Sequence, residues 1–289
     1  MTLRYSNSFS DLVHMHVLTR TTSMDDPASI MSPLFANQSC DPFVSRSSAC
    51  SMGNYVRYAV DVRSAVDIVA AISFAKAHNI RFVIRNTGHD FLGRSTGAGA
   101  LSVWMHHLKE IAFQDWDDPY YKGKAVKVGA GVQGHNIMAA TQGKGQIVIG
   151  GAPTVGPAGG YTQGGGHSPL SSTYGLSADN VLQWEVVTAN GNLLTASRTQ
   201  NTDLYWALSG GGPGNFGVVL SMTVQTHLDA AFSGASVLFQ TSNTSVETFW
   251  KAVDAFHAML PALVDAKAGA IYYITPTVGL PLILTPPPL

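Results

Sequence analysis

Alternation and helical periodicity divide the chain after residue 53 into short elements. Residues 54–62, NYVRYAVDV, alternate aromatic or β-branched positions with others and predict a strand. Residues 66–78, VDIVAAISFAKAH, carry an apolar face at helical spacing, and Ser64 with Asp67 forms a Ser-x-x-Asp helix start. The strand IRFVI follows at residues 80–84. This strand–helix–strand unit favours parallel pairing.

The same patterns continue downstream. A hairpin is predicted at residues 181–197 because Asn190-Gly191 is a strong signal for a tight turn. The other predicted elements are strands at 124–132, 146–151, 235–240 and 269–276, helices at 134–145 and 246–263, and a helix, glycine loop and strand across 203–224. Residues 1–53 are predicted to be irregular, and the final apolar run, LPLILTPPPL, is interpreted as unfinished because no partner elements come after it.

Composition narrows the classes of protein. The chain has 289 residues, a formal net charge of −1, 45% hydrophobic residues and only 12% charged residues, against a usual charged share of about 25%. No basic patch indicates a nucleic-acid partner, and no apolar run approaches the roughly 20 residues of a membrane helix. The length suits one large domain or two smaller ones.

Two cysteines bear on the compartment. Cys40 and Cys50 lie close together in a Ser-rich and Pro-containing segment, which favours a disulfide, with two free thiols as the alternative. Glycosylation sequons at Asn37 and Asn243 also fit export. The N-terminal residues, however, contain no apolar stretch of signal-peptide length. Secretion is therefore suspected, and the localisation stays uncertain.

Glycine is clustered in four turns, at residues 88–99, 129–134, 150–166 and 210–217. Residues 150–166 contain eight glycines and no charge; a disordered linker is the alternative there, but strand-like segments flank it. Glycine-rich turns let backbone N–H groups approach a pyrophosphate closely. None of the four turns is the G-x-G-x-x-G that opens a helix after the first strand of a Rossmann unit, so glycine alone does not name the ligand.

Three long motifs name a family. IRNTGHDFLGRSTGAGALSVW, GGAPTVGPAGGYTQGGGHSPLSSTYGLSADNVLQWEVVTANG and DLYWALSGGGPGNFGVVLSMTV resemble the flavin-binding domain of the vanillyl-alcohol-oxidase superfamily, in particular the berberine-bridge-enzyme-like oxidoreductases in a fungal style. The resemblance covers residues 53–227 and continues more loosely to about residue 275. It implies an α+β fold in which a two-subdomain PCMH-type FAD-binding domain precedes the start of an antiparallel-sheet substrate domain.

The resemblance implies a covalent FAD. In this family the histidine of the first Gly-rich turn attaches to the 8α-methyl of the flavin, which here is His89. A neutral imidazole nitrogen is a competent nucleophile near pH 7, and Gly88 removes bulk beside it; the alternative is a polar turn residue with FAD bound non-covalently. Many relatives add a second link through a cysteine, where this chain has Ala152. A single link through His89 is therefore predicted, with no cysteinyl link.

The resemblance also implies the remaining cofactor-binding residues. The pyrophosphate side is assigned to Asn86, Thr87, Gly88, Asp90, Arg94 and Ser95, and the flavin face with the phosphates to Gly156, Gly159, Gly160, Gly165, Gly166 and His167. The dimethylbenzene edge is assigned to Ser177, Asp179 and Asn180, and the adenine side to Val187. The loop that closes the flavin site is assigned to Gly214, Asn215, Phe216, Gly217 and Val218. For the individual glycines, plain turn geometry is the alternative.

Other chemistries find little support. The adjacent His106 and His107 cannot both face one site from a regular strand or helix, and no set of ligands at metal spacing accompanies them. No metal is predicted, and His107 with Trp104 is assigned to core or flavin-side packing. No G-x-S-x-G elbow indicates a serine hydrolase.

The predicted activity is that of an FAD-dependent oxidase or dehydrogenase acting on a small alcohol, sugar or secondary-metabolite substrate, with hydride transfer to flavin N5 and O2 as final acceptor. The catalytic base is unknown; Tyr161 and Tyr272 are weak candidates, beside Gln163 and Tyr273. Neither nucleic acid nor membrane is an expected partner, and the oligomeric state is unknown.

The expected organisation has three parts. Residues 1–53 form an irregular segment with the Cys40–Cys50 loop, residues 54–229 the FAD-binding domain, and residues 230–289 a partial substrate domain. The chain is expected to be C-terminally truncated relative to the family. The alternative function is accordingly a truncated, non-catalytic flavin-binding protein or an incomplete gene model.

Overall fold

The computed structural model describes residues 15–16, 45–49, 51–90, 92–232, 234–275 and 282–285. Asn37, Cys40 and Cys50 lie outside these residues, so the predicted disulfide and the first sequon stay predictions. The protein has a mixed α+β structure with sheets of four, five, two and three strands among the described residues. This architecture agrees with the predicted fold class.

The four-stranded sheet has the order β1-β2-β4-β3. Its strands are β1 (Met15–His16), β2 (Tyr58–Asp61), β4 (Leu101–Trp104) and β3 (Phe82–Arg85). The predicted parallel pairing is confirmed, but β2 and β3 each pair with β4, which lies between them. Strand β1 pairs with β2 antiparallel, although the N-terminal segment was predicted to be irregular. Two residues are too few to leave an alternation signal.

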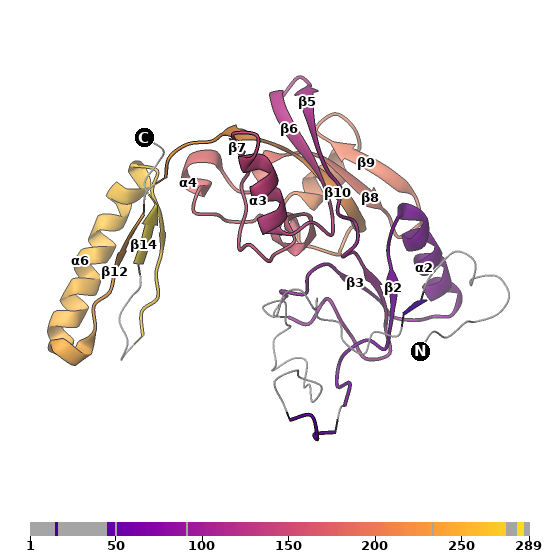
Figure 1. The fold of residues 1–289 in the computed structure, drawn as a ribbon, viewed down its shortest axis with the longest axis horizontal. Helices are drawn as coiled ribbons and strands as arrows, with labels where there is room; N and C mark the ends of the chain where they lie inside the picture. Colours follow the sequence, from indigo (N-terminus) through magenta and orange to yellow (C-terminus); the bar gives the residue numbers. More distant parts are fainter. Residues whose placement is uncertain are drawn as a thin grey trace.

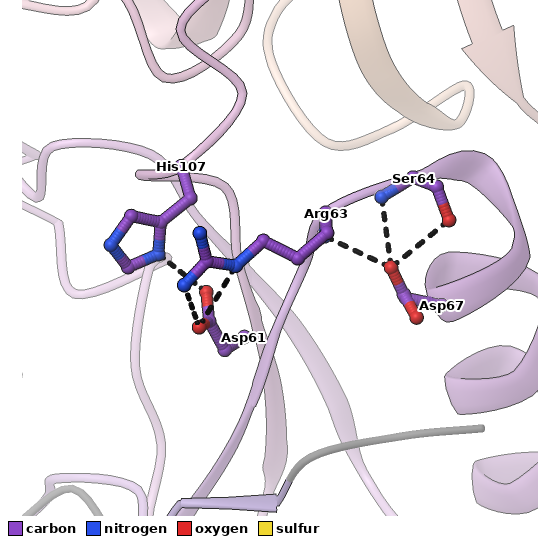
Figure 2. Close-up of polar contacts among 5 residues, drawn as sticks. All are labelled: Asp61, Arg63, Ser64, Asp67 and His107. Atoms are coloured by element: carbon purple, nitrogen blue, oxygen red, sulfur yellow. Dashed lines mark hydrogen bonds and ion pairs between the residues drawn. The ribbon is translucent and has the colours of Figure 1, made fainter. Parts of the chain in front are cut away.

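Helix α2 (Ala65–Ala77) connects β2 to β3 and begins where Ser64 and Asp67 predict. Asp67 Oδ2 accepts hydrogen bonds from the backbone N–H of Ser64 at 2.8 Å and of Arg63 at 2.9 Å (Figure 2). A helix leaves its first N–H groups without partners inside the helix, and an acidic side chain here satisfies neighbouring donors and complements the helix dipole. Local chemistry therefore fixes the start of α2.

Replacing Asp67 with alanine is expected to lower the free energy of unfolding by about 1 kcal/mol, because the backbone N–H groups of Arg63 and Ser64 lose their acceptor. Thermal or urea unfolding of the purified chain measures this loss. Ser73→Ala, at an exposed position inside the same helix, is the matched control and should change stability little. An equal effect of both substitutions would contradict the capping role.

The five-stranded sheet is antiparallel, with the order β5-β6-β10-β8-β9. Its strands are β5 (Ile111–Asp117), β6 (Lys122–Gly129), β10 (Val218–Gln225), β8 (Val181–Val187) and β9 (Leu193–Ser197). The predicted hairpin is confirmed as β8–β9, with Gly191 at a φ of +79° in its turn. Strands β4 and β5 were not predicted.

Shorter elements surround this sheet. They are α3 (Gly134–Gln142), β7 (Gln146–Ile147), the π-helical turn η1 (Pro157–Tyr161), α4 (Ser171–Tyr174), the 3-10 turn η2 (Ala178–Asn180), α5 (Thr202–Leu208) and β11 (His227–Leu228). The strand predicted at residues 146–151 is reduced to β7, which pairs with β11. The glycine-rich stretch 150–166 is not a linker, since Ala158 and Thr162 within it are fully buried.

One hydrophobic core joins the two large sheets. Val60 and Val103 from the first sheet, Ile68 from α2, and Trp184 and Met222 from the second sheet belong to the same buried cluster. Figure 1 shows α2, β2 and β3 on one side of this body and β8, β9 and β10 beside them. The two sheets are therefore packed together, and the turns at their ends have fixed relative positions.

The last part of the chain lies at one end of the molecule in Figure 1, and Ser172 Oγ in α4 donates a hydrogen bond to its Ala268 carbonyl oxygen at 3.1 Å. This part contains β12 (Ala235–Val237), the 3-10 turn η3 (Thr241–Asn243), α6 (Val246–Asp265), β13 (Gly269–Ile271) and β14 (Leu282–Thr285). The final apolar run contains β14, which pairs antiparallel with β12 and β13, two strands that precede it in the chain. None of the helices among the described residues could cross a membrane.

Candidate functional site

Three of the four Gly-rich turns meet at one cavity. Its lining residues are Asn86, Thr87, Gly88, His89, Asp90, Arg94 and Ser95 from the first turn, Val155, Gly156, Ala158, Gly159, Gly160, Tyr161 and Gln163 from the third, Pro213, Gly214 and Gly217 from the fourth, and Phe82, Val83, Ile84, Met105 and Val219 from the strands and the residue after β4. The turn at 129–134 does not line it; a side chain on Gly129 or Gly131 would collide with the backbone of residues 105–108.

Asp90 organises the first turn. Its Oδ1 accepts hydrogen bonds from the N–H of Leu92 at 2.9 Å and of Arg94 at 3.1 Å, and its Oδ2 accepts from Ser95 N at 3.0 Å and Ser95 Oγ at 2.9 Å. Burial alone would raise the pKa of Asp90, but these hydrogen bonds outweigh it and hold the pKa below its ordinary value. Asp90 is thus an ionised structural centre of the turn.

Asn86 is bonded to the second turn and packed closely against the third. Its Nδ2 donates a hydrogen bond to the carbonyl oxygen of Ala130. A Cβ atom on Gly156 would collide with the Asn86 side chain, and one on Gly159 would lie 2.6 Å from its Cγ. Both glycines are therefore needed for close approach of the two turns, which is a tertiary requirement in addition to any turn geometry.

Arg94 links the first turn to the fourth. Its Nη2 donates to the carbonyl oxygen of Pro213 at 3.0 Å and to Asn215 Oδ1 at 2.6 Å. The guanidinium is exposed and lines the cavity. It therefore brings a positive charge to the place where the two turns meet.

His89 is half-buried on the cavity wall, and its Nε2 lies 3.0 Å from Thr154 Oγ1 in the third turn. This contact orients the His89 ring, and its two partners are 65 positions apart in the sequence. This contact occupies Nε2, and when the Thr154 hydroxyl accepts a hydrogen bond from Nε2–H, the lone pair of the neutral ring lies on Nδ1. Nδ1 is then the nucleophilic nitrogen of the imidazole.

A second cavity adjoins the first and shares Phe82, Ile84, Gly214 and Gly217 with it. Its other lining residues are Ile72, Ala75, Lys76, Asn79, Ile80, Val187, Ala189, Asn215, Phe216 and Val218. Four of these, Val187, Asn215, Phe216 and Val218, were predicted as cofactor-binding. Two hollows with a common wall suit an elongated ligand that places one end in each.

Known proteins resemble the chain closely. Residues 56–197 match the FAD binding domain family. An FAD-linked oxidoreductase of Phaeosphaeria nodorum, sthB, is 52% identical over 241 residues, covering 83% of this chain and 76% of the relative. FAD-linked oxidoreductase ZEB1 of Gibberella zeae is 57% identical over 251 residues, covering 86% of this chain but 44% of the relative.

The chain belongs to the FAD-linked oxidoreductases of the VAO type. The crystal structure of the VAO-type flavoprotein MtVAO615 from Myceliophthora thermophila superposes with a TM-score of 0.84 at 52% identity, over 89% of this chain and 47% of that chain. The chain spans about half the length of several relatives that it matches. FAD as the cofactor class and the fungal character of the relatives agree with the predictions from sequence.

Part of the predicted cofactor-binding set lies beside the cavity rather than in its wall. Gly165, Gly166, His167, Ser177, Asp179 and Asn180 do not line either cavity. Ser177 Oγ lies 2.8 Å from Thr162 Oγ1, and Asn180 Oδ1 accepts hydrogen bonds from Gln225 and His227 at 2.7 Å. The Ser177 contact joins this segment to the third turn and the Asn180 contacts join it to β10 and β11. A direct role of these residues at the cofactor stays a prediction.

The two tyrosine candidates differ in position. Tyr161 lines the cavity, its hydroxyl donates to the carbonyl oxygen of His167 at 2.7 Å, and burial raises its pKa to about 12. A tyrosine with this pKa is a hydrogen-bond donor near neutral pH and a poor proton acceptor. Tyr272 lines neither cavity and packs against Phe256, with ring centroids 5.0 Å apart. Tyr273 is exposed.

His106 and His107 both contact Trp104, with ring centroids 4.9 and 5.1 Å from the indole. They can do so because they lie in a turn, not in a regular strand or helix. His107 Nδ1 also lies 2.5 Å from Asp61 Oδ1, and Arg63 donates to the other oxygen of Asp61 at 2.7 Å (Figure 2). The part of the chain described by the structure contains no group of three metal-binding side chains.

Sequence patterns missed two residues at this site. Thr154 orients His89, and Arg85 is buried directly before the first turn. Thr154 lies two residues after Ala152, within the motif that carries the resemblance. Arg85 occupies an inward-facing position of β3, where alternation predicts an apolar residue. An arginine at an inward-facing strand position was the sequence feature that could have marked Arg85 as a functional residue.

Proposed function

We propose that the chain binds FAD along its two adjoining cavities, and that it belongs to an enzyme that oxidises a small alcohol, a sugar or a secondary metabolite. The observation that carries this proposal is the meeting of three Gly-rich turns around His89 at one cavity. Such turns present backbone N–H groups to a diphosphate. The family of the chain supports the cofactor.

The residues present fit this cofactor. Gly156 and Gly159 lie so close to Asn86 that any side chain would fill the space between the turns. Asn86 Oδ1 and Gln163 Oε1 are buried without a hydrogen-bond partner among the described residues, and both residues line the cavity. Buried polar atoms usually have partners, and the polar groups of a bound dinucleotide would supply them.

Bound FAD would accept a hydride from the substrate at N5 and pass the electrons to O2, the proposed final acceptor. The protein residues position and enclose the reacting groups. Arg94 joins the first and fourth turns, and Asn86 joins the first and second and packs against the third. Tyr161 donates a hydrogen bond instead of accepting a proton. A base for the substrate is not assigned among the cavity-lining residues.

We infer that His89 forms one covalent bond to the flavin, from Nδ1 to the 8α carbon. The 8α carbon and the imidazole would each give up one proton, the electron pair of the broken C–H bond would reduce the flavin, and O2, the proposed acceptor, would take up these electrons with release of hydrogen peroxide. The contact between Nε2 and Thr154 supports this choice of nitrogen. Position 152 is an alanine and supplies no thiolate for a second bond. The proposed attachment is therefore single.

The proposed activity is tested with the purified chain and a panel of primary alcohols, sugars and phenolic alcohols. Anaerobic addition of a substrate should bleach the yellow absorbance of the flavin, and admission of air should restore it with release of hydrogen peroxide. A flavin that binds but is bleached by none of these compounds would support the alternative, a flavin-binding protein without catalysis. A colourless chain that takes up no added FAD would refute both.

A further inference from the structure

Arg85 ends strand β3 with its side chain inside the protein. Only 1% of the residue is exposed. Burial lowers its pKa to about 10, while the nearby Tyr55 hydroxyl and Asp90 carboxylate act on this pKa in the opposite direction. The guanidinium is therefore still charged at neutral pH. A buried charge without a partner is strongly destabilising, so its position requires an explanation.

The described part of the chain does not provide a full set of partners. Nη1 and Nη2 are both buried, and neither donates a hydrogen bond to any described residue. The carboxylate of Asp90 contributes a favourable field, but its oxygens already accept four hydrogen bonds from Leu92, Arg94 and Ser95. Arg85 is consequently a buried cation whose guanidinium has no hydrogen-bonded counter-ion among the described residues.

The guanidinium lies directly behind the first turn. A Cβ atom on Gly88 would collide with Nη2 and would lie 2.7 Å from Cζ of Arg85. Gly88 itself lines the cavity, together with Thr87 and His89 on either side of it. The charge of Arg85 therefore lies against the backbone of a residue that lines the cavity.

The charge balance of the cavity indicates which kind of ligand the charge of Arg85 suits. Among the described residues that line it, Arg94 is the one permanent cation and Asp90 the one carboxylate. A diphosphate carries two negative charges, whereas Arg94 supplies one positive charge to this cavity and Lys76 lines only the adjoining one. A second arginine behind the turn would correct this imbalance.

We propose that Arg85 is a positioning residue for FAD, whose buried guanidinium provides the counter-charge for the diphosphate across the backbone of Gly88. This inference rests on the proposed binding of FAD. It assigns Arg85 a role that depends on the ligand's phosphates and not on its flavin ring. A purely structural arginine would support all ligands equally.

The test compares ligands with and without the diphosphate. In a His89→Ala background, where flavin is held without a bond, the flavin is removed by dialysis and the affinities for FAD, ADP and riboflavin are measured by calorimetry. Arg85→Met should weaken FAD and ADP binding by roughly 10- to 100-fold, the scale of a lost charge-assisted interaction, and leave riboflavin within about twofold. Arg85→Lys keeps the positive charge and should lose less affinity for FAD and ADP than Arg85→Met.

Stability gives a second readout. Without ligand, Arg85→Met should unfold at the same temperature as its parent or higher, because it removes an unpartnered buried charge. The increase of Tm on adding ADP should shrink in Arg85→Met and persist in Arg85→Lys. Arg81→Met, an exposed position four residues earlier, is the control for both measurements.

The outcomes separate the two proposals. Equal ADP affinity in Arg85→Met and its parent, or an equal loss of ADP and riboflavin binding, would overturn the role of Arg85 while FAD binding stands. If Arg85→Met does not fold, Arg85→Lys replaces it in the test. An Arg85→Lys variant that folds but binds ADP no more tightly than riboflavin would also overturn the role of Arg85. A parent that binds neither FAD nor ADP would instead refute the proposed function.

Discussion

His89→Ala should convert a covalently bound flavin into one that is released by acid. The imidazole is the proposed nucleophile, Gly88 leaves space beside it, and Thr154 Oγ1 holds its Nε2 at 3.0 Å. Precipitation of the unsubstituted protein should carry the yellow colour into the pellet, whereas precipitation of His89→Ala should leave all of it in the supernatant. Mass spectrometry should find FAD on the peptide containing His89 and none on the peptide containing Ala152.

Two further variants sharpen this result. His78→Ala removes an exposed imidazole at the end of α2, and the flavin should stay bound in the pellet. Thr154→Val removes the contact to Nε2 and should slow attachment about fivefold, the value of one hydrogen bond of about 1 kcal/mol. Thr154→Ser should restore the rate. A flavin that survives acid in His89→Ala would show that another residue forms the bond.

Gly88→Ala is expected to have the largest effect on stability. Gly88 has a φ of +87°, and an added Cβ would collide with the buried guanidinium of Arg85. Left-handed backbone and overpacking together should lower the free energy of unfolding by about 2–5 kcal/mol. The turn should also lose FAD, because its N–H groups shift with the backbone. Urea unfolding and flavin content measure both effects.

Gly99→Ala is the matched control for this substitution. Gly99 has a similar φ of +73°, but no described atom lies within 4 Å of an added Cβ, so only the backbone term applies and the loss should be about 1–2 kcal/mol. The difference between the two variants isolates the contact with Arg85. In the Arg85→Met background, Gly88→Ala should cost less, because an unbranched methionine adapts to the added atom. Equal losses at Gly88 and Gly99 would exclude the contact as the cause.

Local patterns were sufficient for the elements whose signals lie within a few residues. The Ser64–Asp67 pair predicted the start of α2, and Asn190-Gly191 predicted the β8–β9 hairpin, because a cap and a tight turn are completed by neighbours in sequence. Strand β14 and the insertion of β4 between β2 and β3 could not be derived in this way. Their partners lie far along the chain, and pairing with distant strands leaves no local signal.

The same distinction applies to the site. By itself the sequence determined the family, the FAD cofactor class and the turns that carry the site, because glycines and motifs are readable residue by residue. Only the tertiary structure decided which turns meet: Arg94 and Asn215 are 121 positions apart, and Thr154 is 65 positions from His89. It also placed the Arg85 guanidinium behind Gly88. Burial and contact across the core depend on how the two sheets pack, which no local pattern encodes.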